Sequence, residues 1–271
     1  MTEILQDLSP AWLRAAIEAN MYALLPLFGR LAGAQYVETP ALRRSITSVP
    51  FGLFNSLMAA KLEDDSADQV IQEIVADAQR RQMPILWWTG PLTEPTDLEK
   101  RLVGFGFRAA DDHAPGMAVE LAKLNEDLPR LEGLSIRLCE GRQAKKEWTR
   151  AMAEANEIPA EAAFLTEAWE ELVARAEGDV MLPYLAEWNG HPVAVSLMLM
   201  GAGVAGIYGV ATVPEARRRG IGAWVTLAPL LKAREMGYRV GVLASSEMGL
   251  GVYRKLGFVE YCKISSYRWR P

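Results

Sequence analysis

The chain is 271 residues long, half of its residues are hydrophobic, and its net charge is −5 with a sequence pI of about 5.3. Such a chain is long enough to bury one or two hydrophobic cores, and its composition is typical of an ordinary globular protein. The acidic balance excludes a protein whose task is to coat nucleic acid or anionic lipid, so any binding of phosphate must be local.

The N-terminal segment, MTEILQDLSP, is acidic and lacks the basic region and apolar core of a secretory signal. The two cysteines, Cys139 and Cys262, lie far apart and lack CxxC spacing, so we expect neither a disulfide framework nor a metal site. These features favour a cytoplasmic protein in a reducing compartment.

The first half of the chain predicts few regular elements. Its residue pattern indicates an amphipathic helix over 69–81, a short strand MPILWWT over 83–89 and a helix over 97–104. Pro129 and Gly133 mark residues 122–133 as a linker to the second half.

The second half predicts a longer series of elements. LSIRLCE (134–140) predicts a strand, and residues 142–155 and 160–176 predict two helices. Three antiparallel strands follow, MLPYLAEW, PVAVSLMLM and GIYGVATV, the first two joined by an Asn-Gly turn. Residues 192–214 carry no charge and meet the length criterion for a membrane-spanning helix, but their alternation and glycines favour a buried hairpin.

The segment VPEARRRGIGAWVTL (213–227) joins an apolar strand to a helix. A helix N-terminus leaves backbone N–H groups unpaired and carries partial positive charge. Gly220 and Gly222 have no Cβ that would hold phosphate oxygens away from those groups. With charge from Arg217, Arg218 and Arg219, this order predicts a diphosphate site; the alternative is a solvated charged turn. The apolar face of the helix is predicted at Ile221, Trp224, Val225, Ala228 and Leu231.

Two nucleotide-binding motifs are excluded. The chain has no G-x-x-x-x-G-K-[ST] sequence, so nucleotide hydrolysis loses its main support. GAGVAG (201–206) matches G-x-G-x-x-G, but β-branched and aromatic residues follow it as far as Pro214, so it predicts a hairpin turn rather than the start of a helix.

The rest of the chain predicts a buried strand over 238–244, a helix over 247–256 that ends at Gly257, and one or two strands over 258–269. Its YRKLGF parallels RLVGFGF of the first half, which indicates an internal repeat. Where the second half has RRRGIG, the first half has LEDDSADQ (62–69), whose carboxylates would repel phosphate. Only the second copy is therefore expected to bind an anion.

Arg217-x-x-Gly220-x-Gly222, followed by helix, strand, helix and YRKLGF, resembles the [QR]-x-x-G-x-[GA] signature of the GCN5-related N-acetyltransferase (GNAT) superfamily. The resemblance covers residues 134–271 in element order. It implies an α+β fold with a central, mostly antiparallel twisted sheet, splayed parallel strands and flanking helices. It also implies two GNAT-like halves, a degenerate one over 1–125 without a cofactor loop and an acetyl-CoA-binding catalytic domain over 134–271.

The resemblance implies the roles of individual residues. Backbone N–H groups of residues 218–223 would hold the pyrophosphate of acetyl-CoA, and the strand before them would pair with the pantetheine arm at a bulge allowed by Gly209 or Gly206. Ser246 stands where the family commonly has Asn. The predicted cofactor-binding residues are Val210, Thr212, Arg217, Arg218, Arg219, Gly220, Ile221, Gly222, Ala223 and Ser246.

The resemblance also gives candidate catalytic residues. Tyr253 matches the tyrosine that faces the CoA sulfur and protonates the departing thiolate; the alternative is a core tyrosine. Glu247 and Glu215 are candidates for the base, although either also fits a helix-terminal or turn carboxylate. Trp87 and Trp88 either line an acceptor pocket or belong to the core.

The implied reaction is transfer of an acetyl group from acetyl-CoA, as cosubstrate, to an amine of a small molecule or peptide, an acyltransferase activity of EC class 2.3.1. The alternative is a non-catalytic CoA-binding regulatory or interaction protein. The glutamates of residues 142–176 fit either a cationic acceptor or a solvated helix face. We expect no metal, no nucleic acid and no membrane as partners, and the oligomeric state stays open.

Overall fold

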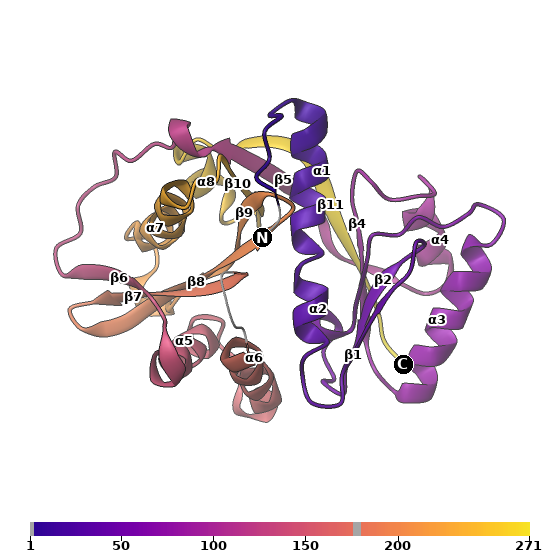
Figure 1. Cartoon of the computed structure of the whole chain (residues 1–271). Coiled ribbons are helices and arrows are strands. Elements are labelled where there is room, and N and C mark those ends of the chain that lie inside the picture. Colours follow the sequence, from indigo (N-terminus) through magenta and orange to yellow (C-terminus); the bar gives the residue numbers. More distant parts are fainter. Residues whose placement is uncertain (1–2, 176–179) are drawn as a thin grey trace. The chain divides into compact units, whose positions relative to one another are not determined.

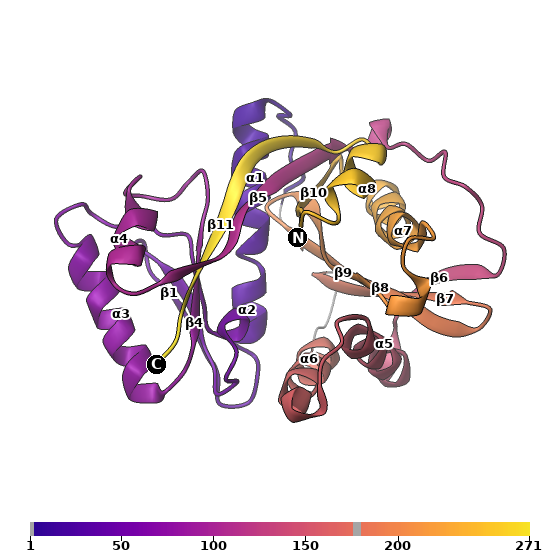
Figure 2. The same cartoon turned by 180° about the vertical axis from the view of Figure 1, so that it is seen from behind.

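The computed structural model describes residues 3–175 and 180–271. The chain divides into two units, which Figures 1 and 2 show from opposite sides with the sequence colours. Unit 1 contains Met1–Met21 and Gly116–Tyr261, and unit 2 contains Tyr22–Pro115 and Cys262–Pro271. Strands β5 (Arg108–Glu120) and β11 (Val259–Trp269) have residues in both units.

This division differs from the predicted domains, 1–125 and 134–271, at both ends of the chain. Helix α1 (Pro10–Met21) belongs to unit 1, where the buried Asn20 amide donates hydrogen bonds of 3.0–3.3 Å to three carbonyls of the β8–β9 hairpin. Residues 262–271 belong to unit 2, where they contain most of a strand. Helix α1 and residues 262–271 each pack with residues far away in the sequence, so local patterns do not reveal the unit to which they belong.

Unit 1 contains a mixed sheet. Its strands in sheet order are β5, β10 (Val240–Ala244), β9 (Val204–Thr212), β8 (His191–Gly201), β7 (Met181–Trp188) and β6 (Leu134–Leu138). Only β9 and β10 pair in parallel, and the other neighbours are antiparallel. The uncharged segment 192–214 therefore forms β8 and β9 of this sheet, as the alternation predicts. The mixed, mostly antiparallel sheet of the sequence prediction is confirmed.

Helices cover both faces of this sheet. Helices α7 (Ile221–Glu235) and α8 (Leu250–Lys255) lie on one face, and α5 (Gly141–Ala155) and α6 (Ala163–Arg175) lie on the other (Figure 1). Predicted helix boundaries shift: α8 spans 250–255 rather than 247–256, α5 begins one residue earlier than expected, and residues 160–162 form a 3₁₀ turn before α6. Residue 176, the predicted end of α6, lies outside the described residues. Short 3₁₀ turns also occur at Leu121–Lys123 and Pro214–Ala216.

Helix α7 buries more of its surface than the predicted face. Trp224 lies partly exposed and donates its indole N–H to the Pro129 carbonyl at 3.0 Å, which ties the linker to the helix. The predicted positions Ala228 and Leu231 are also partly exposed. The buried residues are Ile221, Val225, Thr226, Leu227, Pro229, Leu230 and Ala233.

Pro229 removes one hydrogen bond inside α7, because proline has no N–H to donate to the carbonyl of Val225. The fully buried Ser196 hydroxyl of β8 replaces that donor, at 2.7 Å from the Val225 carbonyl oxygen. A buried carbonyl without a partner costs about 1–3 kcal/mol. The serine thereby compensates the proline and joins the helix to the sheet.

Replacing Ser196 with alanine is therefore expected to lower the free energy of unfolding by about 1–3 kcal/mol. Urea denaturation followed by circular dichroism measures this change. The matched control is Ser135→Ala, at an exposed position of β6 in the same sheet, for which we expect a change within about 0.5 kcal/mol. Equal denaturation midpoints for Ser196→Ala and the unmodified protein would contradict the compensation.

Unit 2 contains a smaller mixed sheet. Its strands in sheet order are β1 (Gln35–Glu38), β2 (Arg43–Ile46), β3 (Ser56–Met58), β4 (Ile85–Thr89) and β11. Its helices are α2 (Leu24–Phe28), a 3₁₀ turn η1 (Gly52–Asn55), α3 (Ala67–Arg81) and α4 (Leu98–Gly104). Helices α3 and α4 share a core with β4 and β11. The predicted elements α3, β4 and α4 are confirmed, whereas the short elements before them were not predicted.

The two units repeat one series of elements. The order β3, α3, β4, α4 in unit 2 matches β9, α7, β10, α8 in unit 1, and the first and third elements pair in parallel in both. In each unit, the strand that pairs antiparallel with the third element comes from the other half of the sequence. Gly116–Glu120 of β5 pairs with β10, and Ser265–Trp269 of β11 pairs with β4. Neither half of the sequence therefore contains all the strands of its own sheet.

Candidate functional site

Strand β9 separates from β10 in the middle of unit 1. The two strands pair only as far as Gly206, and β9 then continues to Thr212 without a partner on that edge among the described residues. Gly209, with φ +57°, and Val210 lie opposite a single residue of β8, so this is the predicted bulge. Gly206 has another reason to be glycine, since a Cβ there would overlap the Asn20 side chain.

The loop after β9 presents unpaired backbone N–H groups. Gly220 caps α7 in the left-handed region at φ +85°, and Arg218 has φ +62°. Within the described part of the chain, the N–H groups of residues 218–222 donate no hydrogen bond. The Ala223 N–H donates to the Gly220 carbonyl at 3.1 Å, so the predicted set of free amides, 218–223, is shorter by one residue.

The three arginines of the loop have different surroundings. Arg217 holds the loop in place, because it donates to the Thr212 and Ala155 carbonyls at 3.0 and 3.1 Å and to the Glu157 carboxylate at 3.0 Å. The Arg219 guanidinium lies 5.1 Å above the Trp188 ring. The Arg218 side chain has no ion-pair or hydrogen-bond partner among the described residues. It is the arginine whose charge is available to a bound anion.

Gly222 lies in the first turn of α7 and faces open space. A Cβ added there would meet no heavy atom within 4 Å, and the residue does not have the positive φ that favours glycine. The fold therefore has no need of glycine at this position. A side chain would instead fill the space beside the free amides, so the residues present fit a diphosphate group.

Tyr253 of α8 also borders the site. Its side chain is 9% exposed, and burial raises its pKa to about 12, so the phenol is protonated at neutral pH. Its ring packs edge-on against Phe258 and directly on Gly249, where a Cβ would lie 2.6 Å from the ring. The Ser246 hydroxyl accepts a hydrogen bond from the Gly249 N–H at 3.3 Å.

These elements border one cavity of about 770 Å³ within unit 1. It brings together the predicted residues Val210, Thr212, Arg217, Arg218, Gly220, Ile221, Gly222, Ala223, Ser246 and Tyr253. Arg219 and Glu247 do not line it, nor does Glu215, and all three are exposed. The size lies within the range of small-molecule sites in proteins.

Sequence reasoning missed several residues that line the cavity. Asn156 and Glu157 follow the end of α5, and no motif marks them. Met248 is 91% exposed, and a methionine in a loop gives no signal of its own. Gly249 could have been found from its spacing of four residues from Tyr253. The other lining residues that were missed are Ala155, Ala211, Ala216 and Val252.

The corresponding gap in unit 2 is closed by the chain itself. Beyond the parallel pairs of β3 and β4, the Glu94 N–H donates to the Ala60 carbonyl at 2.9 Å, and the Leu62 N–H donates to the Glu94 carbonyl at 3.0 Å. At the N-terminus of α3, Arg101 pairs with Asp64 and Asp68. Carboxylates of the chain thus occupy the position where unit 1 offers free amides.

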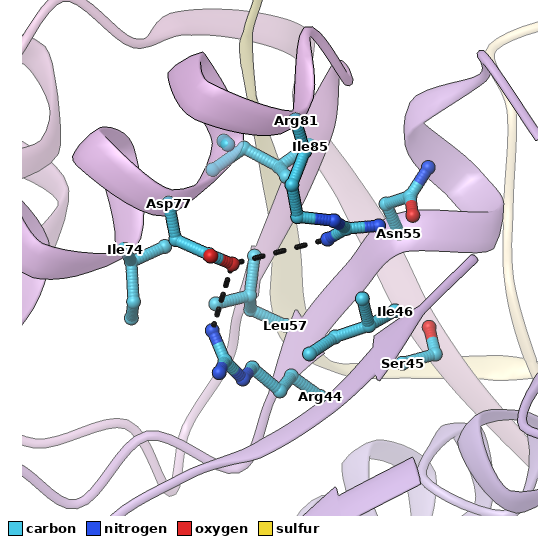
Figure 3. Close-up of a pocket in the computed structure, with 10 residues that line it drawn as sticks. Arg44, Ser45, Ile46, Asn55, Leu57, Ile74, Asp77, Arg81 and Ile85 are labelled. Atoms are coloured by element: carbon cyan, nitrogen blue, oxygen red, sulfur yellow. Dashed lines mark ion pairs between the residues drawn. The ribbon is translucent and has the colours of Figure 1, made fainter. Parts of the chain in front are cut away.

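A second cavity, drawn in Figure 3, has room for about one water molecule, with a volume of about 10 Å³. The Asp77 carboxylate of α3 lies between the guanidinium groups of Arg44 and Arg81, at 3.7 and 3.9 Å (Figure 3). Arg81 also donates to the Thr47 carbonyl at 2.7 Å. These contacts join α3 to β2, which is a structural role.

Neither a metal cluster nor a membrane-spanning helix occurs in the described parts of the chain. Among residues 3–175 and 180–271, no group of three or more His, Cys, Asp or Glu side chains is arranged to hold a metal ion. No helix in these two ranges has the length and apolar character needed to cross a bilayer.

Known proteins resemble the chain in sequence and in fold. The family described as the acetyltransferase (GNAT) family matches residues 143–258. A GCN5-related N-acetyltransferase from Kribbella flavida has a TM-score of 0.70 and 19% identity, over 93% of this chain and 95% of that chain. One from Sphaerobacter thermophilus has a TM-score of 0.59 and 19% identity, over 88% and 76% of the two chains.

A tandem GNAT protein from the clavulanic acid biosynthesis pathway has a TM-score of 0.61 and 14% identity, over 84% of this chain and 78% of that chain. No curated protein sequence matches the chain. The fold, with its splayed parallel strands and amide-lined loop, is the GNAT fold. Residues 143–258 thus match the GNAT family in sequence, and the fold is shared with GCN5-related N-acetyltransferases, among them a tandem GNAT protein.

Proposed function

We propose that this protein transfers the acetyl group of acetyl-CoA directly to an amine of a small molecule or peptide. One observation carries the proposal. Free amides at the start of α7, the unpaired edge of β9 and the Tyr253 side chain all border the same cavity. Diphosphate, pantetheine and thioester would each find a suitable partner there, in the order in which they occur along acetyl-CoA.

Each part of the cavity has a role in this proposal. The N–H groups of residues 218–222 and the Arg218 side chain bind the diphosphate. The backbone of β9 between Val210 and Thr212 pairs with the pantetheine amides. The amine nitrogen bonds to the thioester carbonyl carbon, the carbon–sulfur bond breaks, and the sulfur takes a proton from the Tyr253 hydroxyl. The nitrogen loses a proton to the base as the amide forms, and a proton from solvent restores the Tyr253 phenol.

The acceptor amine must lose a proton before it attacks. An alkylamine with a pKa near ~10.4 is neutral in only about one part in a few thousand at neutral pH. Glu157 is the carboxylate among the described residues that line the cavity, and it pairs with Arg217. We retain Glu247, which lies between the lining residues Ser246 and Met248 in sequence, as the candidate base, acting through a water molecule.

The lack of an unpaired carboxylate among the described lining residues favours one alternative, a CoA-binding protein without turnover. Calorimetry and thiol release separate the two functions. We expect one molecule of acetyl-CoA per chain, and thiol release with at least one member of a panel of polyamines, amino acids, aminoglycosides and peptides. Binding without release by any acceptor would support the alternative, and no binding would contradict both.

Replacing Tyr253 with phenylalanine tests the proton donor. Because general acid assistance contributes about 10²- to 10⁴-fold, we expect kcat to fall at least about 100-fold. The affinity for CoA should change less than about twofold, since the ring and its packing on Gly249 remain. Tyr261→Phe, outside the cavity, is the control for losing a phenol. An unchanged kcat for Tyr253→Phe would remove this role from the residue.

A further inference from the structure

Unit 2 contains a cavity of about 540 Å³ that the acetyl-transfer site does not use. It lies on one face of the β4–β11 pair. Trp88 lies opposite Ser266, and Leu86 lies opposite Arg268, so these four side chains share a face. Their neighbours Trp87 and Tyr267 point to the other face, into the core with α3 and α4.

The 3₁₀ turn η1 covers only part of this face. Its Phe54 is fully buried against Phe28, with ring centroids 5.1 Å apart. Phe51, just before the turn, is 41% exposed and lines the cavity together with Leu53. An exposed aromatic ring beside Leu86 and Trp88 gives the cavity an apolar wall as well as an apolar floor. Burial of this surface by a ligand would be favourable.

The Trp88 indole is fixed within the cavity floor. Its N–H donates to the Ser56 hydroxyl at 3.2 Å, so its polar atom is satisfied within the protein. The rest of the ring remains partly exposed and offers a flat apolar surface. Trp87 is fully buried in the core, as one of the two predicted roles has it, whereas Trp88 lines this cavity, which is separate from the acetyl-transfer site. An acceptor pocket formed by these tryptophans stays a prediction.

The charged side chains among the described residues that line this cavity are those of Arg268 and Arg270, and Pro271 lines it as well. Both are exposed, and neither side chain forms an ion pair or hydrogen bond with a described residue. No Asp or Glu side chain lies among the described lining residues to pair with them. In a protein with net charge −5, two unpaired guanidinium groups beside an apolar floor favour an anion, and the guanidinium fork matches the two oxygens of a carboxylate or sulfonate.

We propose that this cavity binds a flat apolar or aromatic molecule with one anionic group. The apolar body would lie over Trp88 and Leu86, and the anion would lie between Arg268 and Arg270. The volume fits a small organic ligand, since such sites usually measure about 300–1,000 Å³. All the described lining residues belong to unit 2, so ligand binding here can be tested independently of the acetyl-transfer site.

Two fluorescent probes with the same aromatic body test the proposal. One is 8-anilino-1-naphthalenesulfonate, which carries a sulfonate, and the other is N-phenyl-1-naphthylamine, which is neutral. Each is titrated into the full chain with excess coenzyme A present to occupy the unit 1 cavity. We expect the double variant R268Q/R270Q to bind the sulfonate about tenfold or more weakly, and the neutral probe within about twofold of the unmodified protein.

Arg108→Gln is the matched control, because Arg108 is exposed, belongs to unit 2 and does not line the cavity. The Arg108→Gln variant should bind the sulfonate with the same affinity as the unmodified protein. Arg270 follows the last residue of β11, so Arg270→Gln alone tests the site without altering the strand. Three outcomes would overturn the proposal. The sulfonate could fail to bind, it could bind the unmodified protein, R268Q/R270Q and Arg270→Gln with equal affinity, or R268Q/R270Q could bind the two probes with equally reduced affinity.

Discussion

Replacing Gly222 with leucine is expected to weaken the binding of coenzyme A by about 100-fold or more without loss of fold. The added side chain would occupy the cavity beside the free amides, where it meets no protein atom at its Cβ. Losing two charge-assisted hydrogen bonds, at about 1.5–3 kcal/mol each, corresponds to at least this factor. Stability should stay equal or rise slightly, because leucine is the better helix former. Calorimetry and thermal denaturation measure the two effects.

Gly251→Leu is the matched control for this prediction. Gly251 also lies in a helix, without positive φ and with open space around its Cβ, but it does not line the cavity. Gly220 is less suitable, because its φ of +85° would add strain to any substitution. Unchanged CoA affinity in Gly222→Leu would remove the loop from the binding site. Equal loss in both variants would indicate a general effect of leucine rather than a local one.

Residues 134–271 on their own are expected not to form a stable unit. This fragment lacks α1 and also lacks Gly116–Glu120, the strand that pairs with β10. Met117, Val119 and Leu121 belong to the same core cluster as the α7 side chains. Burying three such residues contributes roughly 5–9 kcal/mol, which is comparable to the whole stability of a domain. Circular dichroism and thermal denaturation of the purified fragment measure the outcome.

Cleavage of the intact protein in the linker provides the control for this fragment. A protease site placed between Leu131 and Gly133 leaves every strand in its sheet, so the nicked protein should melt like the uncut one. Co-expression of residues 1–131 with 132–271 should likewise restore the fold. The pairing of β5 residues with β10 and of β11 residues with β4 is an exchange of strands between the two halves of the sequence. A fragment 134–271 that unfolds cooperatively at the temperature of the intact protein would contradict this exchange of strands.

Much of unit 1 is predictable from the sequence for a local reason. Strand alternation, the Asn-Gly turn and helical periodicity act within a few residues, and they give β7, β8, β9 and α5 nearly at their observed bounds. The loop with free amides is predictable as a candidate anion site because two glycines at a strand–helix junction let an anion reach the backbone amides there. Tyr253 is found from its distance to Gly257, and it lines the cavity, while its catalytic role stays a prediction.

The exchange of strands could not be predicted in this way. Residues 116–120 have the same alternation whether they pair with β4 or with β10, so the pattern does not indicate the partner. The roles of the three consecutive arginines, 217–219, also cannot be told apart from the local sequence. Contacts with residues distant in sequence, Ala155 and Glu157 for Arg217 and Trp188 for Arg219, distinguish the arginine that holds the loop from the one that lies outside the cavity.

The exchange of strands also sets the time at which the protein can fold during synthesis. Unit 2 needs residues 262–271, yet the whole of 116–261 is translated before them. At about 5–20 residues per second, the ribosome adds these roughly 150 residues in about 7–30 seconds. Throughout this interval β4 has an open edge, the kind of edge that pairs with other chains. The nascent protein is therefore an expected client of chaperones that shield unpaired strands.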